Sequence, residues 1–308
     1  MAETPAGDQP DPKPPHRRRR RRWLKVLGVL SLLGVLMLPA CGHIQVALLP
    51  IAESIGPEGT FRVDVGDEKL IALTIDDGPS THTDAILDLL AAHGVTATFF
   101  IHADHLDAMG EAGQAAVERL LREGHELGNH TTMDVPSVSL SESEFVSTFE
   151  RADERLRQLG VEPRWFRTAG GNFNPDTMLP TMIAAGYEPT FAMGSFMPWD
   201  TFLHLPATYG KQIGKAAFPG AILVLHEGIG EQADRGERTL TTLRKLIEVT
   251  EARGYRMRTL SEVVDRSRQI DTGQGLGEID VRPVGHEVDV GIPGAVVRFE
   301  FADDVEHR

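Results

Sequence analysis

The chain has 308 residues, of which 25% are charged, and its formal net charge at pH 7 is −14. This length supports one sizeable globular domain with appended segments. The acidic balance argues against nucleic acid as a partner, because phosphate contacts need clustered Lys and Arg. A metal ion, or a neutral or cationic polymer, suits such a surface better. The single cysteine, Cys41, excludes an intramolecular disulfide.

The amino-terminal segment has the composition of an export leader. Residues 1–16 are polar and Pro-rich, which predicts disorder. Arg17–Arg22 then precede an apolar run, Trp23–Leu38, which is short for a membrane span but fits the apolar region of a signal peptide. The basic end of this segment resembles a twin-arginine export signal. We therefore expect the body to be exported and held at the outside of the cytoplasmic membrane or in the periplasm.

The residues that follow the apolar run resemble a lipobox, in which a small residue precedes a cysteine that receives lipid. The run ends in Leu38-Pro39-Ala40-Cys41. Cys41 is therefore the expected lipid attachment site and the membrane contact of the mature chain. The alternative is an uncleaved membrane anchor that contains a chance cysteine.

Composition and punctuation predict four segments along the chain. Residues 1–41 form the disordered basic leader with its signal and lipobox, and residues 42–65, with several Gly and Pro, form a linker. Residues 66–268 form the main domain. Residues 269–308 form an acidic, Gly-rich tail whose alternating apolar residues fit either a small β hairpin or a loose tail.

The main domain alternates strand and helix patterns about seven times, which predicts an α/β fold with a parallel sheet closed into a barrel. Chemistry in such barrels lies at the carboxyl ends of the strands. The expected strands are 70–75, 97–102, 126–130, 164–168, 188–192, 221–226 and 255–260, and the expected helices are 83–93, 112–123, 141–159, 176–185 and 238–253.

The first candidate site follows the apolar strand that begins at Leu70. Asp76 and Asp77 end this strand, and Gly78-Pro79 then turn the chain. Side chains alternate along a strand, so both carboxylates can face one site only if the strand bends where it ends. One carboxylate can then hold a metal ion while the other takes a proton. The alternative is an ordinary turn, in which Asp and Gly are common.

A second candidate site follows a later strand. His130 and Asp134 are four residues apart, so one helical turn would put them on the same face, although such a pair is more often a solvated surface. With Asp77 they would supply three protein ligands and leave open positions, which is the pattern of a catalytic metal.

Three stretches resemble the motifs of the polysaccharide deacetylases with a NodB homology domain, carbohydrate esterase family 4. Thr74–Pro79, TIDDGP, is similar to the T-F-D-D-G motif, Asn129–Asp134 is similar to the second motif, and Leu223–His226, LVLH, matches the last motif, L-x-L-H. The resemblance extends over roughly residues 66–268. It implies a distorted (β/α)7 barrel, a divalent metal that is usually zinc, and hydrolytic removal of acetyl groups from N- or O-acetylated polysaccharides.

The resemblance also implies roles for single residues. Asp76 is the expected general base, His226 the general acid, and Asp77 and His130 are metal ligands. Asp134 stands where the second motif usually has His. A second anionic ligand would quench more of the ion's charge, and the oxygen-richer site could accept other divalent ions.

The third and fourth motifs depart further from the family pattern. Arg167 is kept and is expected to pair with Asp76, but the usual prolines after it are replaced by a stretch with Gly170 and Gly171, which could offer a backbone N–H to an oxyanion. In the loop of the fourth motif, Trp199 could stack on a sugar and Asp200 could orient His226; the alternative is an ordinary folded surface loop.

Two other functions remain open from the sequence. The changed motifs also fit a catalytically impaired sugar-binding module, and a related barrel could act on a non-sugar amide. No serine nucleophile is expected, because Ser80 lacks the G-x-S-x-G elbow. The remaining histidines show no ligand spacing and are interpreted as incidental: His82, His93, His102, His105 and His125.

Overall fold

A computed structural model of the chain describes residues 42–198, 200, 205–228 and 234–273, with strand residues 283–284, 287–292 and 295–300. The leader, its predicted lipid site Cys41, and Trp199 lie outside the described residues. Within the described part, no helix is both long and apolar enough to cross a membrane.

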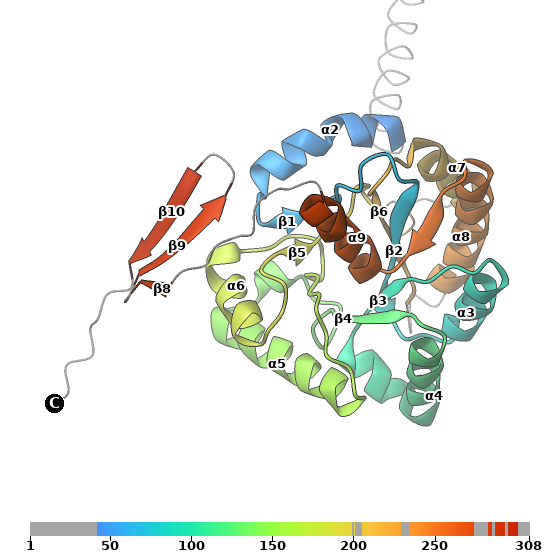
Figure 1. Ribbon diagram of the computed structural model, residues 1–308. Helices are drawn as coiled ribbons and strands as arrows, with labels where there is room; N and C mark the ends of the chain where they lie inside the picture. Colours follow the sequence, from blue (N-terminus) through green and yellow to red (C-terminus); the bar gives the residue numbers. More distant parts are fainter. Residues whose placement is uncertain are drawn as a thin grey trace, which may run out of the picture.

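Seven strands pair in parallel and form the centre of the molecule (Figure 1). The larger sheet has the order β4-β3-β2-β6, and β7 pairs with the first residues of β2. All nine residues of β2 are buried, as expected for a parallel strand covered on both faces. The strands are β1 (Gly59–Thr60), β2 (Leu70–Gly78), β3 (Thr98–Ile101), β4 (Glu126–Asn129), β5 (Phe191–Ala192), β6 (Ile222–His226) and β7 (Arg256–Arg258).

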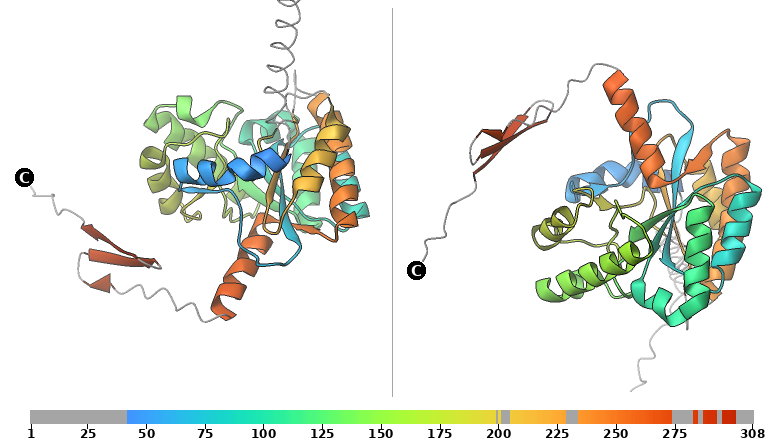
Figure 2. Two further views of the ribbon diagram at one scale, coloured as in Figure 1. Left: turned by 90° about the horizontal axis from the view of Figure 1, so that it is seen from above. Right: turned by 60° about the horizontal axis from the view of Figure 1, so that its bottom comes forward.

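Helices surround these strands, so the architecture is an α/β fold of the distorted (β/α) barrel type (Figures 1 and 2). The ring of hydrogen bonds is incomplete, because β1 and β5 form a separate two-stranded sheet. The helices are α2 (Gly42–Ile55), α3 (Thr83–Ala92), α4 (Ala103–Arg122), α5 (Glu142–Gln158), α6 (Pro175–Ala184), α7 (Pro206–Ala216), α8 (Asp234–Ala252) and α9 (Leu260–Gly273).

Local sequence signals explain several element boundaries. Ser141 and Glu144 form a capping box at the start of α5: the Glu144 carboxylate accepts the Ser141 N–H at 2.8 Å, and the Ser141 hydroxyl accepts the Glu144 N–H at 3.4 Å. Helix α4 begins nine residues before the predicted start. Gly110 has φ 55 inside it and kinks the helix, which interrupts the apolar periodicity.

Two predicted strands are shorter than expected. The stretch 164–168 forms one isolated bridge, Asn129 to Phe166, and the stretch 188–192 is reduced to β5. Phe166 packs in an aromatic cluster with Phe149 and Phe191, so its burial comes from side-chain packing and not from a continued ladder. The apolar pattern alone does not distinguish a residue that is buried by side-chain packing from one that is buried in a continuous strand.

The prediction that residues 42–65 form a linker is wrong. Residues 42–55 form α2, and residues 59–60 form β1, which pairs with β5. Gly42 lies so close to α7 that a Cβ there would be 2.7 Å from the Cβ of Ala216. The helix contains Pro50, and this breaker concealed it in the sequence.

The tail contains a three-stranded antiparallel sheet, in which β9 and β10 form the hairpin expected as one of two alternatives. Its strands are β8 (Pro283–Val284), β9 (Glu287–Ile292) and β10 (Ala295–Glu300).

Candidate metal and catalytic site

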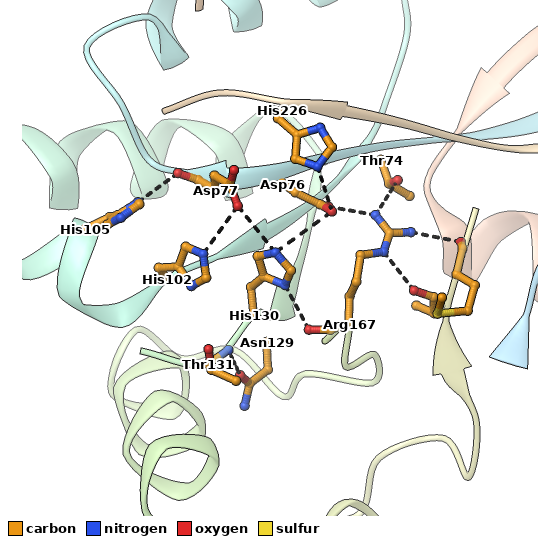
Figure 3. Close-up of polar contacts among 12 residues, drawn as sticks. Thr74, Asp76, Asp77, His102, His105, Asn129, His130, Thr131, Arg167 and His226 are labelled. Carbon is orange, nitrogen blue, oxygen red and sulfur yellow. Dashed lines mark hydrogen bonds and ion pairs between the residues drawn. The ribbon is translucent and has the colours of Figure 1, made fainter. Parts of the chain in front are cut away.

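The backbone bends at the end of β2, so that two adjacent carboxylates reach one site. The register between β2 and β3 shifts between Asp76 and Gly78, so Asp77 occupies a bulge. Its φ of 66 lies in the left-handed region, which a non-glycine residue adopts at a cost of about 1 kcal/mol or more. The predicted bend is therefore present, and Asp76 and Asp77 both face the carboxyl ends of the strands (Figure 3).

Two buried imidazoles face the carboxylate of Asp77. His102 directly follows β3 and His130 directly follows β4. Their Nε2 atoms lie 3.3 and 3.4 Å from Asp77 Oδ1, and the rings stack with centroids 4.5 Å apart (Figure 3). Among the described residues, these three form the one group of His, Cys, Asp and Glu close enough to share an ion.

The spacing and chemistry of this group fit a divalent metal. Ligand atoms about 2.0–2.1 Å from a tetrahedral zinc ion lie about 3.3–3.4 Å apart. The ring nitrogens of His102 are buried and have no hydrogen-bond partner among the described atoms. His130 Nδ1–H donates to the Arg167 carbonyl at 2.8 Å, which leaves Nε2 as the ring nitrogen that faces the group.

The protonation states of Asp77 and His102 favour metal binding. Burial opposes ionisation of Asp77, but its contacts with His102 and His130 outweigh burial and hold the pKa of its carboxyl well below the ordinary value. Burial, together with the charge of His130, lowers the pKa of His102 to about 4, although Asp77 opposes this shift. His102 is therefore neutral at pH 7, as a metal ligand must be.

The structure does not bring Asp134 into this group, in contrast to the predicted ligand set. Thr131 has φ 66, and residues 132–135 form bends and not the helical turn that the four-residue spacing assumed. Asp134 is exposed. His102, which the sequence analysis interpreted as incidental, takes the third position. The available signal was its place directly after a buried strand, which it shares with His130.

Asp76 is held by Arg167, as predicted from the motif order. Arg167 Nη1 donates to Asp76 Oδ1 at 2.7 Å (Figure 3). The guanidinium also lies 4.2 Å from the centre of the Phe100 ring. Further hydrogen bonds to Thr74 and the carbonyls of Ala192 and Met193 fix the guanidinium in a buried position. This charge-assisted contact fixes the direction of the Asp76 carboxylate.

His226 lies on the other side of Asp76. Its Nε2 is 3.8 Å from Asp76 Oδ2, and its Nδ1 is 3.2 Å from Asp200, which also accepts the His226 backbone N–H at 2.8 Å. Asp200 therefore orients His226, one of the two interpretations that the sequence left open. Burial alone would lower the pKa of His226, but Asp200, with Asp77 and Asp76, raises it to about 9.

This geometry predicts that Asp200 sets the upper pH limit of an activity in which His226 acts as an acid. The acid form is lost as pH rises through the pKa of His226. In Asp200→Asn the raising charge is gone, so the basic limb of the kcat–pH profile moves to lower pH by about 1–3 units. Initial rates measured from pH 6 to 10 check this. A basic limb that stays in place would show that another group controls it.

Two further contacts hold Asp77, and no sequence pattern indicates them. Arg235, in the first turn of α8, donates to Asp77 Oδ2 at 2.6 Å. His105 Nδ1–H donates to the Asp77 carbonyl at 2.9 Å. One carboxylate oxygen is thereby held by a cation, while the other faces the imidazoles. The bulged backbone of Asp77 is also fixed.

Glu227 fastens the loop after Asp77 to the end of β6. Its Oε2 accepts hydrogen bonds from the Ser80 and Thr83 hydroxyls, each at 2.6 Å, and its N–H donates to the Asp76 carbonyl at 2.9 Å. A Cβ on Gly78 would lie 2.5 Å from Glu227 Oε1, so this approach requires glycine. The Ser80 hydroxyl is committed to this contact, in keeping with the expectation that it is no nucleophile.

Glu227 gives the folded protein a pH-dependent stability. Burial raises its pKa from 4.5 to about 7, against the hydrogen bonds from Ser80 and Thr83, and this rise corresponds to about 3 kcal/mol. The folded state favours the protonated form, so this stability is present below pH 4.5 and is lost as pH rises through about 7. In Glu227→Gln the loss of stability between pH 5 and pH 8 is expected to disappear. Urea unfolding of the chelator-treated parent and variant at the two pH values measures the free energy of unfolding. An equal change of this free energy with pH in both proteins would contradict the prediction.

The predicted substrate contacts are less supported by the geometry. The Gly171 N–H donates to the Thr168 carbonyl at 3.2 Å, so it is already used within a turn. Gly170 has φ 78 and lies against Pro136. The predicted stacking of Trp199 falls on a residue outside the described part of the chain.

Comparison with known proteins gives the same assignment as the motifs. Residues 64–190 match the family described as polysaccharide deacetylase; this range includes the Asp77 group and Arg167 but ends before His226. Among solved structures, a peptidoglycan N-acetylglucosamine deacetylase matches with a TM-score of 0.60 and 25% identity, over 68% of this chain and 93% of that one. A pseudoenzyme of carbohydrate esterase family 4 from Bacillus anthracis has the same fold, with a TM-score of 0.59 and 20% identity over 70% and 71%.

Two curated relatives cover almost their whole length. A peptidoglycan-N-acetylglucosamine deacetylase of Bacillus cereus is 29% identical over 216 residues, which are 70% of this chain and 97% of the relative. A chitooligosaccharide deacetylase of Rhizobium leguminosarum bv. trifolii is 33% identical over 209 residues, 64% of this chain and 92% of the relative. The chain belongs to the polysaccharide deacetylase family.

Proposed function

We propose that the protein is a metal-dependent hydrolase that removes acetyl groups from an N- or O-acetylated polysaccharide, with N-acetylglucosamine polymers as the first candidates. One observation carries this proposal: Asp76 Oδ2 and His226 Nε2 lie 3.8 Å apart, beside the group of Asp77, His102 and His130. A base and an acid that flank a metal group suit hydrolysis, whereas sugar binding alone requires neither.

Asp76 and His226 each carry out one of the two proton transfers. Asp76, held by Arg167, takes a proton from the water that attacks the acyl carbon. The water oxygen bonds to that carbon, the bond from carbon to the sugar nitrogen or oxygen breaks, and His226 gives its proton to the departing group. Acetate and a free amine or hydroxyl result. The carboxylate of Asp200 stabilises the protonated His226 before this transfer.

Asp77, His102 and His130 would hold the divalent ion. When bound, the ion supplies Lewis acidity that polarises the acetyl carbonyl and increases the acidity of the attacking water. Two imidazoles and one carboxylate suit zinc, although other divalent ions bind such ligands. With one anionic ligand, itself contacted by Arg235, the group quenches less of the ion's charge than the predicted ligand set would.

The relatives indicate the class of substrate, and the leader indicates the location of the protein. Two relatives are named for peptidoglycan and chitin oligosaccharides, which are polymers of the cell envelope or its surroundings. The leader, with its lipobox at Cys41, supports export, by the twin-arginine pathway, and attachment to the outside of the cytoplasmic membrane. An acidic protein with these attachments is not expected to bind nucleic acid.

Acetate release tests this function. The purified protein is incubated with N-acetylglucosamine oligomers, acetylated xylan and a simple acetanilide. Each is tested after chelator treatment and again after zinc addition. We expect acetate from the glycans, lost with chelator and restored by zinc.

The other outcomes correspond to the alternative functions. Release from the anilide alone would indicate a deacylase of non-sugar amides. If no substrate releases acetate while zinc and oligomers still bind, the protein is a sugar-binding relative, comparable to the family's pseudoenzyme.

A further inference from the structure

Helix α2 lies on the outside of the molecule (Figures 1 and 2), and its outward side carries an apolar stripe. The exposed fractions of Leu48, Ile51 and Ile55 are 52%, 56% and 80%, and Ile44 is half-buried. Their spacing of four, three and four residues puts all four side chains on one side of the helix. A single exposed aliphatic residue is ordinary, but four aligned along one helix form a patch that indicates an interaction surface.

The opposite side of α2 is already packed, so the stripe cannot turn inward. Gly42, Gln45 and Leu49 are buried, with Gly42 against Ala216 of α7. The side chain of Gln45 accepts the backbone N–H of Met197, whose side chain is 62% exposed and extends the apolar surface beside the helix. The orientation of the stripe is therefore fixed by the body of the protein.

The stripe is also uncharged, in contrast to the exposed side of α5. The one Asp, Glu, Lys or Arg in α2 is Glu53, and Arg62 donates two hydrogen bonds to it at 2.7 and 2.9 Å. By comparison, α5 carries five acidic and three basic residues, of which Glu142, Glu150 and Arg151 are exposed. Removing the stripe from water would desolvate no charged group, which favours an apolar surface as its partner.

The chain before α2 indicates which apolar surface this is. Helix α2 begins one residue after Cys41 and four residues after the apolar run Trp23–Leu38. Four residues span at most about 14 Å. Whether the run itself or a lipid on Cys41 is the anchor, α2 therefore begins at the membrane surface.

We propose that α2 lies on the outer surface of the membrane, with Ile44, Leu48, Ile51 and Ile55 at the boundary between headgroups and acyl chains. This inference rests on the exported, anchored location proposed above, but not on the chemistry of the site. The lipid surface then fixes the orientation of the barrel. The segment after Met197 leads to Asp200, so the membrane side of the protein is joined to the acid end of the site.

Depth-dependent quenching tests this contact on the full-length protein. Cysteine is introduced singly at Leu48, Ile51 or Ile55, and at Ser147 on the exposed side of α5 as the control, in a Cys41→Ser background that retains the apolar run. Each protein is labelled with a thiol-reactive fluorophore. It is then reconstituted into vesicles of phosphatidylethanolamine and phosphatidylglycerol, with or without lipids that carry a nitroxide near the headgroup.

We expect the nitroxide lipids to lower the fluorescence of the three α2 probes by about twofold and that of the Ser147 probe by less than about a tenth. Equal quenching at all four positions would overturn the proposal. It would also be overturned if the α2 probes were shielded from water but the nitroxide lipids did not quench them, since a second copy of the chain would then cover the stripe. Acetate release from soluble oligomers, measured on the same samples, reports the proposed reaction separately.

Discussion

Replacing His102 by alanine is expected to lower zinc affinity more than about 100-fold and to remove acetate release at ordinary zinc concentrations. His102 Nε2 lies 3.3 Å from Asp77 Oδ1 and has no hydrogen-bond partner among the described atoms, so its lone pair has no other evident use. Its loss would leave two protein ligands. Competition with a chromophoric chelator measures the affinity, and acetate assays measure the activity.

Asp134→Asn is the matched control, because Asp134 stands at the position where the family's second motif usually has a ligand. It is exposed and outside the metal group, so zinc affinity and rate should stay within about threefold of the parent. His102 is fully buried, so His102→Gln, which fills more of the space, serves beside the alanine variant, and thermal unfolding verifies that each protein folds. If Asp134→Asn loses zinc while His102→Ala keeps it, the proposed ligand set is wrong.

Asp76→Asn is expected to lower kcat by about 100- to 10,000-fold without loss of zinc. The substitution keeps the shape of the side chain but removes the carboxylate that takes the proton. It also leaves the buried Arg167 guanidinium without its anionic partner. Because Asp76 is outside the group of Asp77, His102 and His130, zinc content should stay at the parental value.

Asp77→Asn provides the contrast for this second result. It removes the anionic ligand, so zinc and activity should fall together. Rates and zinc content measured on the same samples separate the two roles. Comparable zinc loss in both variants, or near-parental kcat in Asp76→Asn, would contradict the division between base and ligand.

The sequence predicted those parts of the site that depend on strand ends. Asp76, Asp77, His130 and His226 follow or end buried strands, and parallel strands bring their carboxyl ends together, so their convergence was predictable. The pairing of Arg167 with Asp76 was expected from the motif order and is present. The barrel itself followed from the alternation of strand and helix patterns.

The parts of the site that the sequence analysis missed depend on distances between different elements and not on spacing along one helix. His102 meets His130 across neighbouring strands, so their separation in sequence reflects the length of a connecting helix and carries no ligand signature. Arg235 reaches Asp77 from a helix 158 residues later. The pairing of His130 with Asp134 assumed a helical turn that Thr131, with φ 66, does not allow.

Anomalous diffraction at the zinc edge from crystals of the zinc-loaded protein tests the central claim most directly. We predict a peak about 2.0–2.2 Å from His102 Nε2, His130 Nε2 and an Asp77 oxygen, with Asp76 and His226 beside it and Asp134 not coordinated. A peak that includes Asp134 and excludes His102, or the absence of zinc from the ends of β2, β3 and β4, would contradict the account.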